Sequence, residues 1–217
     1  MFLRHPLLSV LGVDHGFGTL HSPSRPSCST YRQIHGTRVV SVAGNSPAGE
    51  PIEADGLLSN QAGMEVGIWT ADCLPVLMAT LDGRYVGALH AGWRGAVSGI
   101  VRVGLERMKE ASGGNLSLLR VVLGTAIGPC CFDVGPEVWD AVEAGTPGYS
   151  IKERKKLDLW DLVTHQLMSS GVLPSEIGRV SLCTRCHPAL FYSHRGWGPE
   201  RKGRSMLNYI RPTVDDF

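Results

Sequence analysis

The sequence has no long apolar run and almost no net charge. Among its 217 residues, the longest apolar stretches are residues 64–69 and 74–80, far below the roughly 20 residues that a membrane helix needs. Lys and Arg total 21 against 20 Asp and Glu, which leaves a formal net charge of +1. A general nucleic-acid or membrane-surface binder usually carries a larger basic excess. We therefore expect no membrane span and no nucleic-acid partner.

Cysteine is too sparse for a disulfide framework. Six cysteines in a chain of this length do not match the dense pattern of small secreted domains. At the N-terminus, Arg4 precedes an apolar stretch, but Asp14 and His15 follow where a secretory signal would place small residues. We expect residues 1–13 to form a first strand and the protein to be cytoplasmic. In that compartment, cysteine near histidine more often indicates metal binding or catalysis.

The chain does have enough apolar residues for one sizeable core. Hydrophobic residues make up 43% of the sequence and charged residues 19%. Such a composition can bury enough apolar surface to offset the conformational entropy of the chain. Because single domains mostly run to about 100–200 residues and β-rich ones exceed that, we predict one globular domain over residues 1–217.

Seven short apolar runs, each bounded by Gly, Pro, Asp or Ser, are typical of strands. Between two of these runs, Asp82-Gly83 is a hairpin signal, because both residues tolerate the positive φ that tight hairpin turns require. The two flanking strands are therefore predicted to be antiparallel neighbours. The predicted strands cover residues 38–43, 64–69, 74–80, 84–90, 119–127, 179–183 and 204–210.

Three segments show the pattern of helices. Apolar residues repeat at three- and four-residue steps over residues 97–108, a second helix follows an N-cap at Asp158, and a shorter one begins at Pro136. Helices interspersed among about seven strands predict an α+β fold. We expect a mixed, largely antiparallel sheet with flanking helices.

Cys73 and His90 stand at the two ends of the predicted hairpin. Cys73 begins one strand and His90 ends the next, and such ends lie side by side in an antiparallel pair. We therefore expect a contact between the two side chains. The alternative interpretation is a small buried cysteine and a hydrogen-bonded histidine at a strand end. Spacing alone shows no local chelate between these residues and His35.

The turn Gly92-Trp93-Arg94-Gly95 leads from His90 toward a predicted helix. A helix N-terminus presents free N–H groups, and Arg94 adds a positive charge, so this place is suited to an anion such as phosphate. The alternative interpretation is an ordinary loop with a surface arginine and a packing tryptophan.

The string Cys183-Thr184-Arg185-Cys186-His187 matches the signature of c-type haem attachment and also half of a zinc clamp. We reject haem, because such attachment takes place in an export compartment. A zinc clamp needs two further ligands, for which His187 and His194 are the nearby candidates, and we do not expect it. The vicinal pair Cys130-Cys131 is interpreted as part of a loop beside the site or as a turn with buried thiols.

Taken together, the motifs resemble those of the family known as polyphenol oxidase, laccase-domain or YfiH-type proteins. The resemblance covers almost the whole chain, and the strings around Cys73 and His90 are its most specific parts. It rests on Asp14-His15-Gly16-Phe17, Gln33-Ile34-His35-Gly36, Ala54-Asp55-Gly56, Thr70-Ala71-Asp72-Cys73-Leu74-Pro75-Val76, His90-Ala91-Gly92-Trp93-Arg94-Gly95, Gly128-Pro129-Cys130-Cys131, Val134-Gly135-Pro136-Glu137-Val138, Leu157-Asp158-Leu159, and Cys183 followed by Phe191-Tyr192-Ser193-His194-Arg195 and Gly203-Arg204.

The resemblance implies an α+β fold related to toxin-like cysteine hydrolases. It also implies one zinc ion at the positions that correspond here to His35, Cys73 and His90. Three protein ligands leave a fourth position for water or substrate, as catalytic zinc requires. Copper is the less favoured metal.

The family is associated with several activities. These are phosphorolysis of adenosine, inosine, guanosine and methylthioadenosine, adenosine deamination, copper-dependent phenol oxidation, and correction of peptidoglycan precursors. A multicopper oxidase needs many more histidines than the eight present, several of them in His-x-His pairs that this sequence lacks. The nucleic-acid deaminase signature is also absent, so deamination would use another scaffold, with Asp72 as the nearest proton carrier. Asp72 is equally interpreted as an orienting or turn residue.

Our leading hypothesis is a zinc-dependent purine nucleoside phosphorylase that acts on a nucleoside and phosphate. Arg94 is the first candidate for the phosphate, and Arg195 and Arg204 are weaker candidates whose alternative role is surface charge. The second hypothesis is a hydrolase in which Cys73 is the nucleophile and His90 its base, acting on an amide of a cell-wall precursor. The third is a binding module whose zinc is structural.

Overall fold

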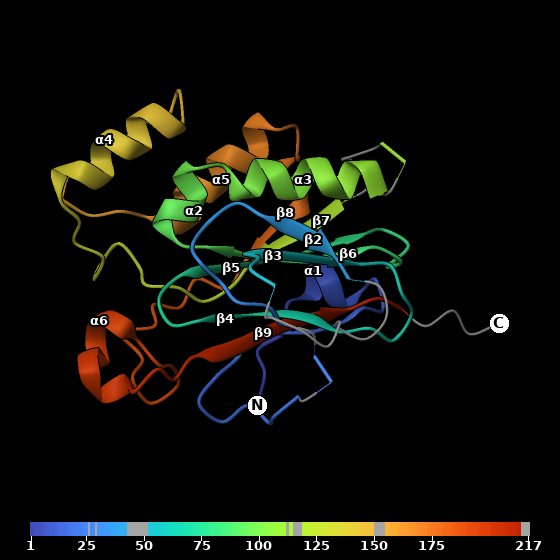
Figure 1. Cartoon of the computed structure of the whole chain (residues 1–217), viewed down its shortest axis with the longest axis horizontal. Helices are drawn as coiled ribbons and strands as arrows, with labels where there is room; N and C mark the ends of the chain where they lie inside the picture. The colour runs from blue at the N-terminus through green and yellow to red at the C-terminus, as the bar shows by residue number, and fades with distance from the viewer. Residues whose placement is uncertain are drawn as a thin grey trace.

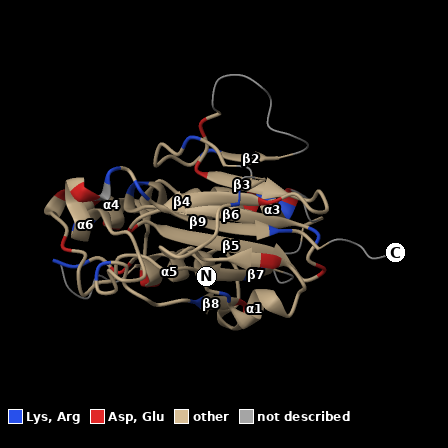
Figure 2. Ribbon diagram, turned by 90° about the horizontal axis from the view of Figure 1, so that it is seen from below, with Lys and Arg blue, Asp and Glu red and all other residues tan. Residues whose placement is uncertain are grey.

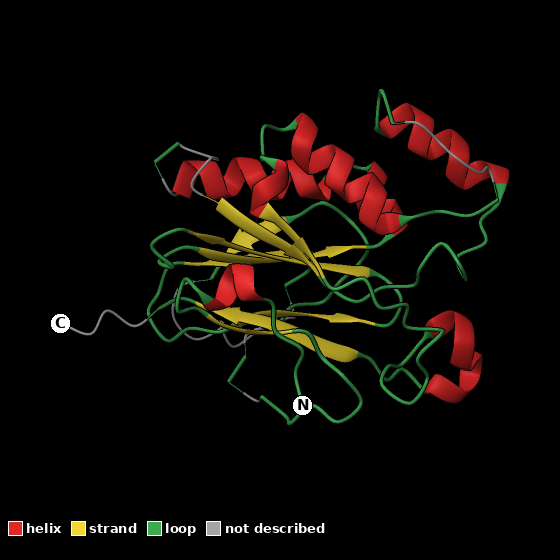
Figure 3. Cartoon of the chain, turned by 180° about the vertical axis from the view of Figure 1, so that it is seen from behind, coloured by secondary structure: helices red, strands yellow, loops and turns green. Residues whose placement is uncertain are grey.

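The chain folds into three layers. A six-stranded sheet lies between a layer of helices and a three-stranded sheet, as Figure 1 shows. Figure 3 presents the same layers from behind, with most of the helices on one side of the sheets. The computed structural model describes residues 1–25, 27–28, 30–42, 52–111, 113–114, 119–149 and 155–213.

The strands confirm the prediction of an α+β fold with mixed, largely antiparallel pairing. The six-stranded sheet has the order β2-β3-β6-β5-β7-β8, and the three-stranded sheet has the order β1-β9-β4. Two pairs, β2 with β3 and β7 with β8, are parallel, and the other described pairs are antiparallel. The strands are β1 (Asp14–Gly16), β2 (Val39–Ser41), β3 (Gly56–Ser59), β4 (Val66–Thr70), β5 (Leu74–Thr80), β6 (Val86–Ala91), β7 (Leu119–Leu123), β8 (Ile177–Arg179) and β9 (Met206–Arg211).

The predicted helices are present, with one break. The segment predicted as one helix over residues 97–108 is divided between α2 and α3, because Gly99 adopts a φ of +93° that a continuous α-helix excludes. Asp158 caps α5 by accepting a hydrogen bond from the amide of Asp161 at 3.0 Å. The helices are α1 (Pro6–Ser9), α2 (Trp93–Val97), α3 (Ile100–Ala111), α4 (Pro136–Gly145), α5 (Leu159–Ser169) and α6 (His194–Trp197), with 3-10 turns η2 (Pro174–Glu176) and η3 (Gly198–Arg201).

Strand β5 is buried on both faces. Its seven residues are all buried, which explains why this strand reads as a nearly continuous apolar run. Val76 and Met78 belong to the core beneath the helices, whereas Leu77 and Ala79 belong to the core between the two sheets. Successive side chains alternate between faces, so one strand contributes to both cores. Burying one large apolar side chain contributes about 1.5–3 kcal/mol.

The predicted hairpin joins β5 to β6. Gly83 has a φ of +68°, and the Asp82 carboxylate accepts a hydrogen bond from the amide of Arg84 at 3.1 Å. The register pairs Pro75 with His90. Asp82-Gly83 therefore sets the pairing that brings the N-terminal end of β5 beside the C-terminal end of β6.

The N-terminal prediction was wrong. Residues 1–13 do not form a strand: Leu3 makes a single bridge to Phe17, and helix α1 follows. The physical reason is local. Pro6 presets the φ of the first helical turn, and His5 Nδ1 accepts a hydrogen bond from the amide of Leu7 at 3.2 Å.

The bounds of β7 and β8 were also predicted wrongly, and strand β3 was missed. Strand β7 ends at Leu123, and only Ala126 forms a further bridge, to Cys183. Strand β8 (Ile177–Arg179) begins before the predicted run 179–183 and shares only Arg179 with it, because its register follows the parallel pairing with β7. Strand β3 was not predicted, since its four residues, which begin with Gly56, are too few to show a period. Its position between β2 and β6 depends on pairing with strands that are distant in the sequence or outside its own segment.

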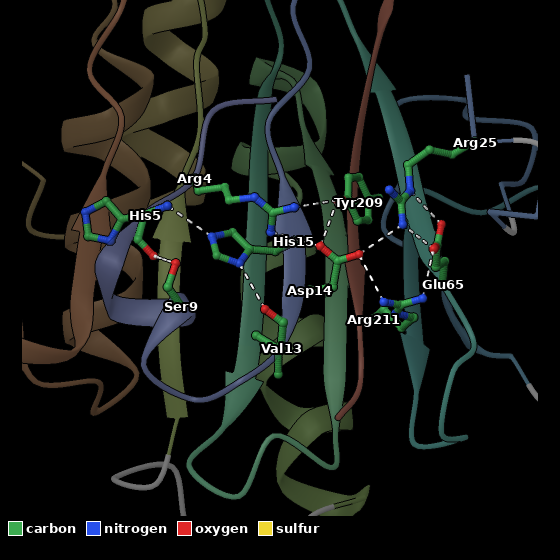
Figure 4. Close-up of polar contacts among 10 residues, drawn as sticks. All are labelled: Arg4, His5, Ser9, Val13, Asp14, His15, Arg25, Glu65, Tyr209 and Arg211. Carbon is green, nitrogen blue, oxygen red and sulfur yellow. Dashed lines mark hydrogen bonds and ion pairs between the residues drawn. The ribbon is translucent and has the colours of Figure 1, made fainter. Parts of the chain in front are cut away.

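A polar network ties the three-stranded sheet together, as Figure 4 shows. One oxygen of Asp14 accepts a hydrogen bond from the Tyr209 hydroxyl at 2.9 Å, and the other lies 3.0 Å from Arg25 and 3.2 Å from Arg211. Arg25 also pairs with Glu65, and its guanidinium lies 3.7 Å from the centroid of the Tyr209 ring. Charges from β1, β9 and the start of β4 therefore hold one another in place.

The network makes stability depend on pH. Burial raises the pKa of Asp14, but hydrogen bonds from Arg4 and Tyr209 and the nearby guanidinium of Arg25 lower it below its ordinary value. Because the folded-state pKa is the lower one, the stabilisation is present above about pH 4 and is lost as the pH falls through the folded-state value.

We expect Asp14→Asn to lower the free energy of unfolding by about 1–3 kcal/mol at pH 7, because the arginines lose a charged acceptor. The deficit should shrink on acidification, when the wild-type carboxyl is protonated as well. Urea denaturation at neutral pH and below about pH 4 measures both quantities. A deficit of constant size across this range would contradict the prediction.

No helix among the described residues is sufficiently long and apolar to cross a membrane. Lys and Arg are interspersed with Asp and Glu along the ribbon (Figure 2). The expectation that no nucleic acid is bound stays a prediction.

Candidate functional site

The hairpin brings Cys73 and His90 together, and the loop before β2 adds His35. The ligating atoms of these three residues all lie within 4.8 Å of one another. The two imidazole rings meet edge to face, with centroids 4.7 Å apart. The structure therefore brings together the three residues that sequence analysis assigned to a metal, from segments far apart in the chain.

Asp55 organises this cluster, and sequence analysis assigned it no role. Its Oδ1 accepts hydrogen bonds from Nδ1 of His90 at 2.8 Å and from the amide of His35 at 2.9 Å. Its Oδ2 accepts from the amides of Ile34 at 3.1 Å and Gly36 at 2.7 Å. One buried carboxylate thus positions two of the three candidate ligands. The motif Ala54-Asp55-Gly56 was the only sequence signal for it.

The hydrogen bond to Asp55 also selects which ring nitrogen of His90 carries the proton. When Nδ1 carries the proton that Asp55 accepts, Nε2 is the ring nitrogen left to bind a metal. Burial lowers the pKa of His90, but Asp55 and the Cys73 thiolate raise it to about 9. Burial raises the pKa of Cys73, but contacts with His35 and His90 lower it to about 7. Cys73 is therefore readily a thiolate, which is the form that binds a metal or attacks a carbonyl.

The backbone around the cluster is unusual at two residues. His35 has a φ of 61° and Asp72 a φ of 90°, in the left-handed region that non-glycine residues rarely adopt. Such conformations persist where their surroundings hold them, and they gather at functional sites. Gly92 is also required, because a Cβ there would lie 2.8 Å from Sγ of Cys73. The chain after β6 therefore passes directly against the thiol.

Gln33 fastens the His35 loop to the edge of the small sheet. Its side-chain amide donates to the carbonyl of Trp69 at 2.8 Å, and its side-chain carbonyl accepts from the amide of Trp69 at 2.7 Å. The pair of bonds replaces the partner that this edge of β4 lacks among the described strands. The same contact places the Trp69 ring, which is 42% exposed, at the site.

A cavity of about 570 Å³ opens above the three-residue cluster. Its volume falls within the roughly 300–1,000 Å³ of small-molecule sites. Its walls come from the β5–β6 hairpin, the start of α2, the loop before α4, and α6. The described lining residues are Gln33, His35, Trp69, Ala71, Asp72, Cys73, His90, Trp93, Arg94, Phe132, Asp133, Val134, Gly135, Glu137, Val138, Leu159, His194, Arg195 and Ser205.

Two of the three predicted substrate arginines reach the cavity. Arg94 lines it, with its guanidinium 4.4 Å from the centroid of the Trp93 ring. Arg195 also lines it and donates to the carbonyl of Asp133 at 3.0 Å. Arg204 is not among the described lining residues, and its guanidinium lies 6.0 Å from the centroid of the Tyr192 ring. Because α2 has only five residues, the positive charge at this wall comes mainly from Arg94 itself.

Asp72 lies in the cavity wall beside Cys73, but both of its carboxylate oxygens are engaged. Oδ1 accepts a hydrogen bond from the Thr184 hydroxyl at 2.5 Å, and Oδ2 accepts from the amide of Arg195 at 2.7 Å. These bonds join the start of β5 to the segment after β8. The geometry favours the orienting role for Asp72 over that of a proton carrier.

A second group, of four thiols, shares no residue with the three-residue cluster. The sulfur atoms of Cys130, Cys131, Cys183 and Cys186 all lie within 4.8 Å of one another, which makes this group a candidate metal site. The sequence offered only His187 and His194 as further ligands, so a zinc clamp was not expected, whereas the structure places Cys130 and Cys131 beside Cys183 and Cys186. His187 Nδ1 instead lies 2.9 Å from the carbonyl of Cys183.

The chain is similar in sequence to proteins that are already known. The family model described as multi-copper polyphenol oxidoreductase laccase matches residues 18–211. The purine nucleoside phosphorylase YlmD of Bacillus subtilis is 35% identical over 162 residues, covering 72% of this chain and 58% of that protein. A purine nucleoside phosphorylase of Xylella fastidiosa is 37% identical over 174 residues, covering 76% of this chain and 65% of that protein. The chain therefore spans about three fifths of these relatives.

The fold is also similar to that of a solved structure. The crystal structure of YlmD from Geobacillus stearothermophilus superposes with a TM-score of 0.85 at 25% sequence identity. The match covers 98% of this chain and 99% of that one. The layered arrangement described above is thus shared over almost the full length of both chains.

Proposed function

The chain belongs to the multi-copper polyphenol oxidoreductase laccase family, and we propose from this premise that it is a zinc-dependent purine nucleoside phosphorylase. One observation carries the proposal. The cluster of His35, Cys73 and His90 opens into the same cavity as Arg94 and Arg195, so a metal donor set and an anion site face one substrate volume.

The donor set fits zinc. One thiolate and two imidazoles are ligands that zinc accepts, and three protein ligands leave a position open toward the cavity. The bond from His90 to Asp55 is the outer contact typical of zinc-binding histidine. When bound, zinc would supply a Lewis acid at the cavity wall. The same donor set with an axial methionine would suit copper, and no methionine is among the described lining residues.

In the proposed reaction, an oxygen of phosphate forms a bond to C1′ of the sugar while the bond from C1′ to the purine nitrogen breaks. The departing purine takes up the proton that the attacking hydrogen phosphate loses, and the products are free purine and a sugar 1-phosphate. Arg94 and Arg195 would hold the phosphate from two sides, because guanidinium groups match oxyanions in charge and geometry. Their fixed positions would favour the transition state without reorganisation.

The aromatic lining suits the purine. Trp69, Trp93 and Phe132 present rings to the cavity, and aromatic rings stack on the π-face of a base. Glu137 lies in the same wall, where its carboxylate could accept hydrogen bonds from sugar hydroxyls. The same rings would also shield the sugar from water, which competes with phosphate for it.

Adenosine, inosine, guanosine and methylthioadenosine are the substrates we propose. Deamination of adenosine would need a water nucleophile and a proton carrier. Asp72 already accepts hydrogen bonds at both oxygens, so the site supports deamination less well than phosphorolysis.

One observation favours a second candidate. The thiolate character of Cys73 beside His90 is also that of a cysteine hydrolase acting on an amide. The metal separates the two functions, because a thiolate bound to zinc is not a free nucleophile. Copper-dependent phenol oxidation is disfavoured, since the described residues form only one histidine-containing metal cluster, with two histidines.

Arg94→Ala tests the function directly. We expect it to raise the KM for phosphate by about 10–100-fold, which corresponds to the roughly 1.5–3 kcal/mol of a charge-assisted hydrogen bond, with a smaller change for the nucleoside. The measurement is purine release from a panel of the four nucleosides with varied phosphate. Arg102→Ala, on the exposed face of α3, is the matched control.

Purine release that proceeds equally well without phosphate would mean hydrolysis and would overturn the anion site. If no nucleoside reacts but an aminoacylated sugar nucleotide is cleaved, the hydrolase takes the place of the phosphorylase.

A further inference from the structure

Two loops at one end of the molecule bring four thiols together. Cys130 and Cys131 follow β7 on the way to α4, and Cys183 and Cys186 lie between β8 and α6. Figure 1 and Figure 2 both place α4 and α6 at the same end of the molecule. The sulfur of Cys186 lies 3.5 Å from that of Cys130 and 3.4 Å from that of Cys131. All four cysteines are free thiols.

The spacing fits a single tetrahedral ion. Four thiolates bound to zinc at about 2.3 Å in a tetrahedron are separated from one another by about 3.8 Å. The sulfur–sulfur separations of 3.4 and 3.5 Å and the upper limit of 4.8 Å for the whole group bracket that value. A disulfide would need about 2.05 Å, and a multi-iron cluster spreads its thiolates over different irons.

The surroundings of the thiols also favour a cation. The amide of Gly128 donates to Sγ of Cys183 at 3.2 Å, as amides do toward metal-bound thiolates. Four thiols so close together would repel one another as thiolates, and a cation among them would offset that repulsion.

We propose that Cys130, Cys131, Cys183 and Cys186 form a second metal site, a closed four-cysteine zinc site with a structural role. Four thiolate ligands complete the tetrahedral coordination of zinc and leave no position for substrate. This separates the site from the cluster of His35, Cys73 and His90, which has only three ligands. The inference does not depend on the proposed function.

The position of the site indicates what it stabilises. Thr184, between two of the ligands, donates to Asp72 at 2.5 Å, and Phe132, next to Cys131, lines the cavity. One ion bound to both loops would therefore fix two walls of the cavity relative to each other. Without it, the loops are joined at this end by weaker contacts, such as the bond from Arg195 to the carbonyl of Asp133.

Metal analysis of purified, zinc-replete protein tests the site. We expect about two equivalents of zinc in wild type, about one in Cys186→Ser and about one in Cys73→Ser. Cys28→Ser is the matched control, because Cys28 belongs to neither group, and it should retain about two equivalents. Two equivalents retained in Cys186→Ser would overturn the proposal.

The remaining outcomes separate this proposal from the proposed function. A single equivalent in wild type that is lost in Cys73→Ser would overturn the four-cysteine site and leave the zinc of the proposed enzyme in place. A single equivalent that is lost in Cys186→Ser would support the four-cysteine site and count against the zinc of the proposed enzyme.

A second measurement needs no variant in the four-cysteine group. Cobalt bound to Cys73→Ser should show the intense visible spectrum of a tetrahedral four-thiolate site. Mass spectrometry after alkylation should find these four cysteines protected until a chelator is added. Prompt alkylation of all four in metal-replete protein, or recovery of iron in place of zinc, would contradict the zinc site.

Discussion

Cys73→Ser should abolish phosphorolysis and remove about one equivalent of zinc. Burial raises the pKa of the Cys73 thiol, but His35 and His90 lower it to about 7, so the thiolate forms readily, whereas a serine hydroxyl does not ionise there and is a poor zinc ligand. Loss of a Lewis acid that contributes several kcal/mol to a transition state lowers the rate by on the order of 10³-fold or more. Turnover of inosine with phosphate and the metal content of the same preparation measure both effects.

The Cys73→Ser experiment has a matched control, and two outcomes would contradict it. Cys28→Ser should keep full turnover and full metal content, because Cys28 lies outside both clusters. If Cys73→Ser retains turnover and metal, the assignment of the site is wrong. If turnover of inosine is lost while the metal content of wild type and variant is the same, Cys73 takes part in the reaction without holding the metal, and its assignment as a ligand is wrong.

Asp55→Asn should weaken zinc binding by about 10–100-fold, which is the usual effect of losing an outer partner of a metal-binding histidine. Asp55 accepts the proton on Nδ1 of His90 and binds the amide of His35 through the same oxygen. Asparagine preserves the shape of the side chain but removes its charge and one of its two acceptor oxygens. The amides of Ile34 and Gly36 then lose an acceptor, so stability should fall by about 1–3 kcal/mol.

Two measurements distinguish a positioning role of Asp55 from a purely structural one. Competition with a chelator gives the zinc affinity, and turnover at saturating zinc shows whether activity returns once the metal is bound. Asp140→Asn, at an exposed position of α4, is the matched control and should change neither quantity. Unchanged zinc affinity in Asp55→Asn, with only a lower melting temperature, would show that Asp55 serves the fold alone.

The local parts of the fold were predictable because their signals are short. Asp82-Gly83 specifies a hairpin by its own backbone preference. Asp158 caps a helix by accepting a hydrogen bond from the amide three residues later. The hairpin alone predicted the contact between Cys73 and His90, since an antiparallel register places them side by side. The same local rules failed at residues 1–13, where a proline and a capping histidine overrode an apolar pattern that resembles a strand.

By itself, the sequence determined most of the element types, the α+β class, the hairpin and, through its motifs, the family. Only the tertiary structure decided which distant groups meet. Asp55 has no neighbour in sequence that reveals its bonds to His35 and His90, and Cys130 lies 56 residues from Cys186, whose sulfur it meets at 3.5 Å. Such contacts leave no periodic pattern and no fixed spacing in the sequence. The groups meet only once the two sheets and the helical layer have packed and the long loops between them have closed.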